Sequence, residues 1–258
     1  MLITSAQIIR ESLSLYRKQW KVLFIYVILF VVVPLGFIIG AGIVIGLLER
    51  FLEISRLFQV ILLLAAGLFS LVLTMWVYVA MATAVHHLIA GQVPPSARRL
   101  LTEAKPLLWP MIYTNAAVLF LILLGTILFI IPGFMFLGWY FFTSLCVIFD
   151  KERGLKPLAS SKNLVIGRWF MLAWRVVAPV TFFAVVVNLL QWLILIPLIY
   201  FARLSTWSPE AIDGIKDLVS TIFYLLLLPL NTVAIVLLYF SAKATPTTPS
   251  HLTPPAAL

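Results

Sequence analysis

The stretch LILLGTILFIIPGFMFLG, from Leu121 to Gly138, determines how many times this chain is expected to cross a membrane. It is apolar almost throughout and contains the pair Pro132-Gly133. Proline cannot continue the hydrogen-bond ladder of a helix, and glycine permits the turn that follows, so the pair predicts a helix break. We therefore expect one span on each side of the pair. The alternative is that residues 107–149 form one broken helix.

The composition excludes a soluble globular protein. Of the 258 residues, 63% are hydrophobic and only 10% are charged, and the mean hydropathy is +1.13. A soluble domain carries roughly 25% charged and roughly 45–50% apolar residues. No soluble core can bury so much apolar surface, so the sequence predicts an all-α, polytopic helical membrane protein with a single transmembrane domain over residues 1–240.

Six apolar segments have about the length that a helix needs to cross the bilayer. Their apolar runs are continuous rather than alternating, which favours helices over a β-barrel. Residues 241–258 are rich in proline, threonine, serine and alanine, which predicts a disordered tail. The predicted spans are residues 22–48, 57–90, 107–131, 134–149, 169–201 and 215–240.

The distribution of basic residues predicts how these spans are oriented. With six spans, the segments on the side of the N-terminus hold 14 of the 18 lysines and arginines, and the other side holds 4. Positively charged loops face the cytoplasm, so both termini are expected there. We assign the net charge of +9 to contact with anionic phospholipids of the bilayer and not to nucleic acid.

Three segments on the basic side are predicted to be amphipathic helices that lie in the membrane interface. In residues 5–20, apolar residues recur at spacings of four, three and four from Ile9 to Trp20, which places them on one helical face. Residues 96–105 repeat this pattern, and residues 158–169 repeat it more faintly. The basic residues expected to contact lipid headgroups are Arg10, Arg17, Lys18, Lys21, Arg98, Arg99, Lys105, Lys162, Arg168 and Arg175.

No residue pattern predicts an active site or a cofactor. The spans hold no aspartate or glutamate near their centres, and the motifs of zinc proteases, serine hydrolases and P-loop enzymes are absent. Cys146 is the only cysteine, so it forms neither a disulfide within the chain nor a cysteine-based metal site. His86 and His87 point about 100° apart on a helix and cannot chelate one metal together. Ligation of a pigment or metal by either histidine alone stays open.

Neutral polar residues also occur within the apolar spans, among them Asn115, Asn188, Gln191 and Asn231. Two interpretations of them stay open. They either form hydrogen bonds between helices that hold the bundle together, or they line a cavity for a solute or a lipid headgroup.

Several short motifs follow one another in order along most of the chain. They are Ser5-Ala6-Gln7, Tyr16-Arg17-Lys18-Gln19, Ala90-Gly91-Gln92, Ser96-Ala97-Arg98, Gly125, Ile131-Pro132-Gly133, Asp150-Lys151, Ser160-Ser161 and Ala178-Pro179. By their order and spacing, the chain resembles the YciC-like family of bacterial inner-membrane proteins, which has no assigned reaction. More distantly, it resembles the membrane domain that accompanies some glycerophosphodiester phosphodiesterases, whose catalytic residues lie in a separate soluble domain. The resemblance implies a six-span protein of the bacterial inner membrane without a catalytic role.

Three functions are compatible with the sequence. The first is a non-enzymatic membrane protein that binds lipid or organises the envelope, which the basic interfacial segments favour. The second is an accessory or structural subunit of a larger membrane protein complex, which the lack of a self-contained active site favours. The third is a transporter or exporter of a small or lipid-like solute, which the prolines and polar residues within the spans favour.

Overall fold

The computed structural model describes residues 2–52, 55–205 and 207–245 of the chain. Within these ranges every regular element is a helix, which confirms the predicted all-α fold. Six helical segments of the described chain are long and apolar enough to cross a membrane, as a multi-pass membrane protein requires. The helices are α1 (Ser5–Leu52), α2 (Arg56–Ile89), α3 (Ala97–Leu128), α4 (Ile130–Trp139), α5 (Thr143–Phe149), α6 (Lys156–Val165), α7 (Trp169–Leu204) and α8 (Pro209–Ala244).

Several helices extend beyond the predicted spans. Helix α3 starts at Ala97, so it includes the segment predicted as the second interfacial helix. Helix α8 ends at Ala244, so the predicted tail begins inside a helix, and residues 246–258 lie outside the described residues. Helices α4 and α5 together form the fourth span, Ile130–Phe149, whose 20 residues are about 30 Å long as a helix.

The break between the third and fourth spans lies at Phe129 and not at Pro132-Gly133. Phe129 has an extended backbone (φ −159°, ψ 140°) between the end of α3 and the start of α4. The predicted position is wrong because Pro132 falls in the first turn of α4, where a helix needs no amide hydrogen. One extended residue is therefore enough to reverse the chain.

Gly133 instead permits α3 and α4 to pack closely as an antiparallel pair. A side chain at Gly133 would place its Cβ 2.2 Å from the Thr126 hydroxyl oxygen and 3.0 Å from the Thr126 Cα. Further along the same pair of segments, the Ser144 hydroxyl donates to the Asn115 side-chain oxygen at 3.0 Å. Residues 107–149 therefore form two antiparallel segments and not one broken helix.

Replacing Gly133 with alanine is expected to destabilise the protein, because the added methyl group has no space against Thr126. Overpacking of this kind costs about 1–3 kcal/mol. We expect that loss in the free energy of unfolding in detergent micelles, measured by circular dichroism during titration with sodium dodecyl sulfate. Gly46→Ala is the matched control, because nothing lies within 4 Å of a Cβ there. Equal stability of Gly133→Ala and the wild-type protein would contradict the close helix pair.

Helix α1 is bent where the predicted interfacial segment meets the first span. Gln19 has non-helical backbone angles (φ −120°, ψ 24°), which sets residues 5–18 apart as the N-terminal segment of α1. Ile8 on this segment is completely buried, whereas Leu13 is 43% and Trp20 is 53% exposed. One face of the segment thus holds it to the bundle, and the predicted apolar face keeps exposed residues that can contact lipid.

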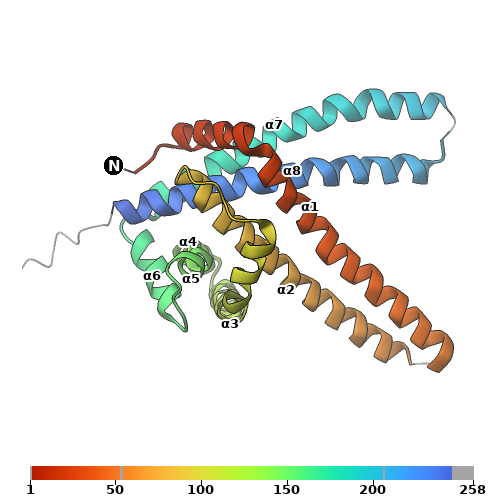
Figure 1. Cartoon of the computed structure of the whole chain (residues 1–258), viewed down its shortest axis with the longest axis horizontal. Helices are drawn as coiled ribbons and strands as arrows, with labels where there is room; N and C mark the ends of the chain where they lie inside the picture. The colour runs from red at the N-terminus through yellow and green to blue at the C-terminus, as the bar shows by residue number, and fades with distance from the viewer. Residues whose placement is uncertain (1, 53–54, 206, 246–258) are drawn as a thin grey trace, which may run out of the picture.

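Helix α8 lies at the centre of the most densely packed part of the molecule (Figure 1). It contacts α1, α2 and α7, and its C-terminal half is buried along most of its length. Val233, Val236 and Tyr239 on this half are completely buried in the hydrophobic core. The last helix of the described chain is therefore the one against which α1, α2 and α7 pack.

Away from this core the helices separate into hairpins. The hairpin of α1 and α2 and the hairpin of α7 and α8 project in different directions, while α3 is seen end-on (Figure 1). Large apolar side chains such as Ile43, Leu64 and Leu193 are exposed on the outer parts of these hairpins. Such surfaces require an apolar surrounding, which lipid or another membrane protein provides.

Hydrogen bonds bring the predicted cytoplasmic segments together at one end of the molecule. The Ile3 amide donates to the Ser241 hydroxyl at 2.8 Å, which joins the two ends of the described chain. The Gly154 amide donates to the Tyr113 hydroxyl at 2.8 Å, which joins α3 to the segment before α6. We call this the packed end, formed by residues 2–20, 83–113, 146–169 and 237–245.

Candidate functional site

Polar contacts at the packed end converge on the last turns of α8. Asp150, which follows α5, accepts a hydrogen bond from the Tyr239 hydroxyl at 2.8 Å and forms an ion pair with Lys243. Tyr239 and Lys243 are four residues apart and share one face of α8. The Asp150 carboxylate therefore fixes the end of α5 against α8.

Ser161 on α6 forms hydrogen bonds with the backbone at the break between α4 and α5 in the fourth span. Its hydroxyl donates to the Trp139 carbonyl at 2.7 Å and accepts from the Phe142 amide at 3.1 Å. The break between α4 and α5 leaves backbone groups without helical partners, and these two bonds satisfy some of them. Ser161 is completely buried, so α6 is part of the protein core and does not lie free in the membrane interface.

Arg168, which was predicted to contact lipid headgroups, is buried in the structure. Its guanidinium donates to the carbonyl of Ala242 at 2.7 Å and to the carbonyl of Thr245, and its Nε donates to the Leu164 carbonyl at 2.8 Å. The carbonyls at the end of α8 have no helical partner, and a cation stabilises them. Burial lowers the pKa of the Arg168 guanidinium, with a smaller contribution from the charge of Arg175. Arg168 thus joins α7 to α8 and is not available to lipid.

Arg168→Gln is expected to lower the stability of the protein without changing the lipid that it retains. The substitution removes hydrogen bonds from a charged donor, which contribute about 1.5–3 kcal/mol each. We expect a loss of at least ~3 kcal/mol in the free energy of unfolding in micelles, and an unchanged content of anionic lipid by mass spectrometry. Loss of lipid without loss of stability would show that Arg168 contacts headgroups.

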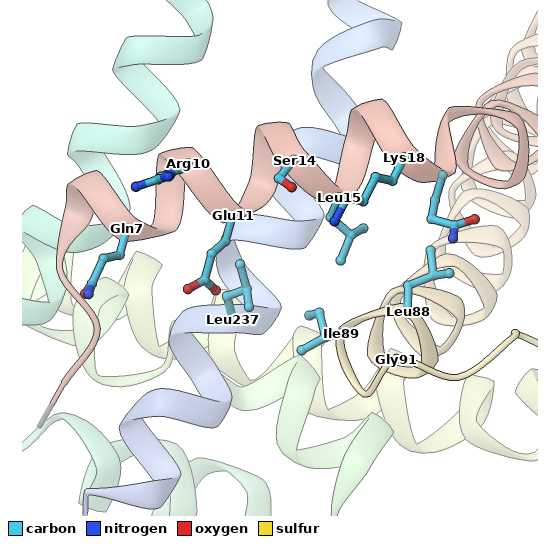
Figure 2. Close-up of a pocket in the computed structure, with 11 residues that line it drawn as sticks. Gln7, Arg10, Glu11, Ser14, Leu15, Lys18, Leu88, Ile89, Gly91 and Leu237 are labelled. Atoms are coloured by element: carbon cyan, nitrogen blue, oxygen red, sulfur yellow. The ribbon is translucent and has the colours of Figure 1, made fainter.

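A groove of about 640 Å³ lies between the N-terminal segment of α1 and the ends of α2 and α8 (Figure 2). Glu11 and Leu15 point from α1 toward α8 and α2, and Leu237 lies below Glu11 (Figure 2). Among the described residues, Arg10 and Lys18 in this groove form no ion pair. The groove thus combines two unpaired cations with one carboxylate and an aliphatic floor. Its lining residues are Gln7, Arg10, Glu11, Ser14, Leu15, Lys18, Gln19, Leu88, Ile89, Gly91 and Leu237.

Most other predicted headgroup residues are also exposed at the packed end. Lys105 lies over the Trp76 ring at 5.8 Å, and the half-buried Lys162 lies over the Trp139 ring at 4.7 Å. These cation–π contacts hold the ammonium groups beside aromatic rings of the kind found at a membrane interface. The exposed residues are Arg17, Arg98, Arg99 and Lys105 at the packed end, and Lys21, which directly follows residues 2–20.

Arg175 on α7 is half-buried. Its Nη1 is buried without a hydrogen-bond partner in the described part of the chain. A buried donor that lacks an acceptor is unfavourable, and because the protein encloses this nitrogen, a lipid phosphate cannot reach it in this structure.

Of the four predicted intramembrane polar residues, two form hydrogen bonds between helices. The Gln191 amide donates to the Ser220 hydroxyl at 2.8 Å between α7 and α8, and the Asn188 amide donates to a carbonyl of its own helix at 2.8 Å. Asn115 binds α5, as described above, and the Asn231 side-chain oxygen is buried with no partner among the described residues. The interpretation as interhelical hydrogen bonds fits Asn115 and Gln191, and these four residues give no support to a shared solute cavity.

His86 and His87 lie at the packed end in different surroundings. The His86 ring stacks on Phe240 with a centroid distance of 4.7 Å, and His87 Nδ1 lies 3.1 Å from Gln92 Oε1. Within residues 2–52, 55–205 and 207–245, no three His, Cys, Asp or Glu side chains group closely enough to hold a metal ion. Cys146 is a buried free cysteine.

Sequence reasoning did not single out Asp150, Tyr239 and Lys243 as partners. One feature of the sequence could have pointed to a structural role for Asp150, because it directly follows an apolar span in a chain with only nine acidic residues. Its partners depend on how α5 packs against α8, and no local pattern encodes that contact.

Comparisons of the chain with protein-family models, with curated proteins and with solved structures gave no match. The resemblance to the YciC-like family therefore stays a prediction. The function proposed below rests on the residues of the packed end.

Proposed function

We propose that this protein is a non-enzymatic membrane protein that binds anionic phospholipid at its packed end. The observation that carries the proposal is the N-terminal segment of α1, where exposed apolar and exposed basic residues lie on neighbouring faces of one helix. Leu13 on this segment, and Trp20 just after the bend at Gln19, suit the acyl boundary of a bilayer, and Arg10 and Arg17 suit its phosphates.

The groove beside this segment supports the proposal with a place for one headgroup (Figure 2). Arg10 and Lys18 are two unpaired cations that a phosphate can neutralise. Leu15 and Leu237 offer aliphatic surface for the first carbons of the lipid tails. The Glu11 carboxylate offsets one of the two positive charges, so the net charge of the groove is +1. The groove therefore suits a singly charged headgroup such as that of phosphatidylglycerol better than a highly charged ligand.

The double substitution Arg10→Gln and Lys18→Gln is expected to weaken retention of phosphatidylglycerol. Each basic residue near an anionic surface contributes about 1 kcal/mol, so two together correspond to a change on the order of thirtyfold in affinity. The measurement is native mass spectrometry of protein released from nanodiscs that contain phosphatidylglycerol and phosphatidylcholine.

The matched control for this experiment is Arg50→Gln with Arg56→Gln, which removes two exposed charges at the opposite end of the same hairpin. We expect this control to retain phosphatidylglycerol like the wild-type protein. Equal retention by both double variants and the wild-type protein would remove the groove from the proposal.

We infer further that the packed end faces the cytoplasm of a bacterial inner membrane. The 14 basic residues on that side of the predicted spans support the orientation, and the resemblance to the YciC-like family supports the membrane. In a Cys146→Ala background, a membrane-impermeant maleimide added to whole cells should label Arg56→Cys and leave Arg98→Cys unlabelled until the cells are lysed. The reverse pattern would contradict the orientation.

A second candidate function, an accessory subunit of a membrane complex, is favoured by the outer parts of the hairpins. Phe51, Trp192 and Phe201 are exposed there, and aromatic residues are frequent in protein interfaces. This candidate predicts a protein partner in fixed proportion that survives mild solubilisation, whereas lipid binding alone predicts none.

A further inference from the structure

A second cavity at the packed end lies between α2, α3 and the segment that joins α5 to α6. Its volume is about 600 Å³, which is within the range of small-molecule sites. It shares no lining residue with the groove in Figure 2. We call it the His86 cavity, and its ionisable lining residues are His86, His87, Glu103, Lys151, Glu152 and Arg153.

One wall of the His86 cavity is a strained but firmly held backbone segment. Lys151 has a φ of +54°, in the left-handed region that residues other than glycine rarely adopt. Such a conformation costs roughly 1–3 kcal/mol and persists only where neighbouring contacts impose it. Here Asp150 is anchored on α8, and the Gly154 amide is held by Tyr113. The structure therefore maintains an unfavourable conformation that keeps residues 151–153 beside the cavity.

This wall carries charges of both signs that the protein leaves unmatched. Lys151 and Arg153 are exposed and form no ion pair in the described part of the chain. One Glu152 oxygen accepts from the Ser160 hydroxyl at 2.8 Å, but the other oxygen is buried with no partner among the described residues. A carboxylate oxygen in that position is unfavourable, so a cation bound in the cavity would stabilise it.

The other walls add a second carboxylate and a fixed aromatic surface. Glu103 on α3 is paired with Arg99 at 2.8 Å, and both side chains are largely exposed, so this ion pair is weak and Glu103 stays available. The His86 ring on α2 is held by Phe240 at 4.7 Å and Phe149 at 5.2 Å. Carboxylates beside aromatic rings are a favourable surrounding for an ammonium group.

From the unpaired charges of residues 151–153, with Glu103 on α3 and the His86 ring on α2 across the cavity, we propose that the His86 cavity binds a small zwitterion that carries a phosphate and an ammonium group, with the chemistry of phosphoethanolamine. Lys151 and Arg153 bind the phosphate, since two cations separated by one residue suit the oxygens of a negatively charged phosphate group. Glu152 and Glu103 bind the ammonium. Both free phosphoethanolamine and the headgroup of phosphatidylethanolamine present this chemistry. The proposal does not rest on the lipid groove, because no residue lines both sites.

The first experiment uses the full chain in nanodiscs of phosphatidylglycerol alone, which contain no ethanolamine headgroup. Phosphoethanolamine, inorganic phosphate and ethanolamine are titrated in turn by isothermal calorimetry. We expect phosphoethanolamine to bind at least ten times more tightly than either of its halves, because only the zwitterion engages both sets of charges. Equal binding of inorganic phosphate would overturn the zwitterion in favour of a simple anion site.

Substitutions then place the binding in the cavity. Glu152→Gln and Arg153→Gln should each weaken phosphoethanolamine at least tenfold, while Lys156→Gln, an exposed cation three residues away outside the cavity, should leave it unchanged. Lys151→Gly covers the case in which the first two variants fail to fold, because it removes a cation and also relieves the left-handed strain. It should weaken binding without lowering thermal stability. Binding that none of the three variants changes would overturn the assignment.

A separate arm distinguishes the free zwitterion from the lipid. The protein is released from nanodiscs of mixed phosphatidylethanolamine and phosphatidylglycerol, and its bound lipids are identified by native mass spectrometry. Phosphatidylethanolamine retained by the wild-type protein and by Lys156→Gln, but lost from Arg153→Gln, assigns the lipid as the ligand. Binding of the soluble compound alone assigns the free zwitterion. Absence of both kinds of binding would overturn the proposal, and it would leave the phosphatidylglycerol experiment on Arg10 and Lys18 unaffected.

Discussion

The polar contacts that end on the last turns of α8 hold the rest of the structure together. Within a bilayer, apolar side chains gain little by moving from lipid into protein, so helices associate through close packing and polar bonds. Asp150 and Arg168 come from different segments, and both bind α8 or the residue after it. α8 is the last helix of the described chain and contacts α1, α2 and α7, so the core between these helices is complete only once α8 is in place. The hairpins then diverge from this point (Figure 1).

Composition and the continuous apolar runs were enough to predict a helical membrane protein with six spans, because the bilayer imposes the length and polarity of each segment. The positions of breaks were harder to predict. Proline within an apolar run predicts a helix break at Pro132. Because Pro132 lies in the first turn of α4, the helix tolerates it, and the chain reverses at Phe129 instead. Nothing in the local sequence distinguishes Arg168 from the basic residues near it. Its role differs from theirs because its guanidinium donates a hydrogen bond to the Ala242 carbonyl of α8. Contacts of this kind join residues more than 70 positions apart, so no local pattern reports them.

The structure divides into two parts with different surroundings. At the packed end, buried hydrogen bonds fix the backbone, while the basic residues on α1 stay exposed beside apolar ones such as Leu13. In the outer parts of the hairpins, apolar side chains are exposed and the surrounding lipid or a partner must cover them. A rigid end with exposed basic residues next to a lipid-facing end is an arrangement that suits the proposed recognition of headgroups.

Native mass spectrometry of the wild-type protein, extracted from its own membrane under mild conditions, tests lipid binding most directly. We predict a chain that carries a small and reproducible number of anionic phospholipids, enriched over their share of the surrounding membrane. A protein partner in fixed proportion, with bound lipids that only mirror the composition of the membrane, would contradict this and make the chain a subunit of a complex.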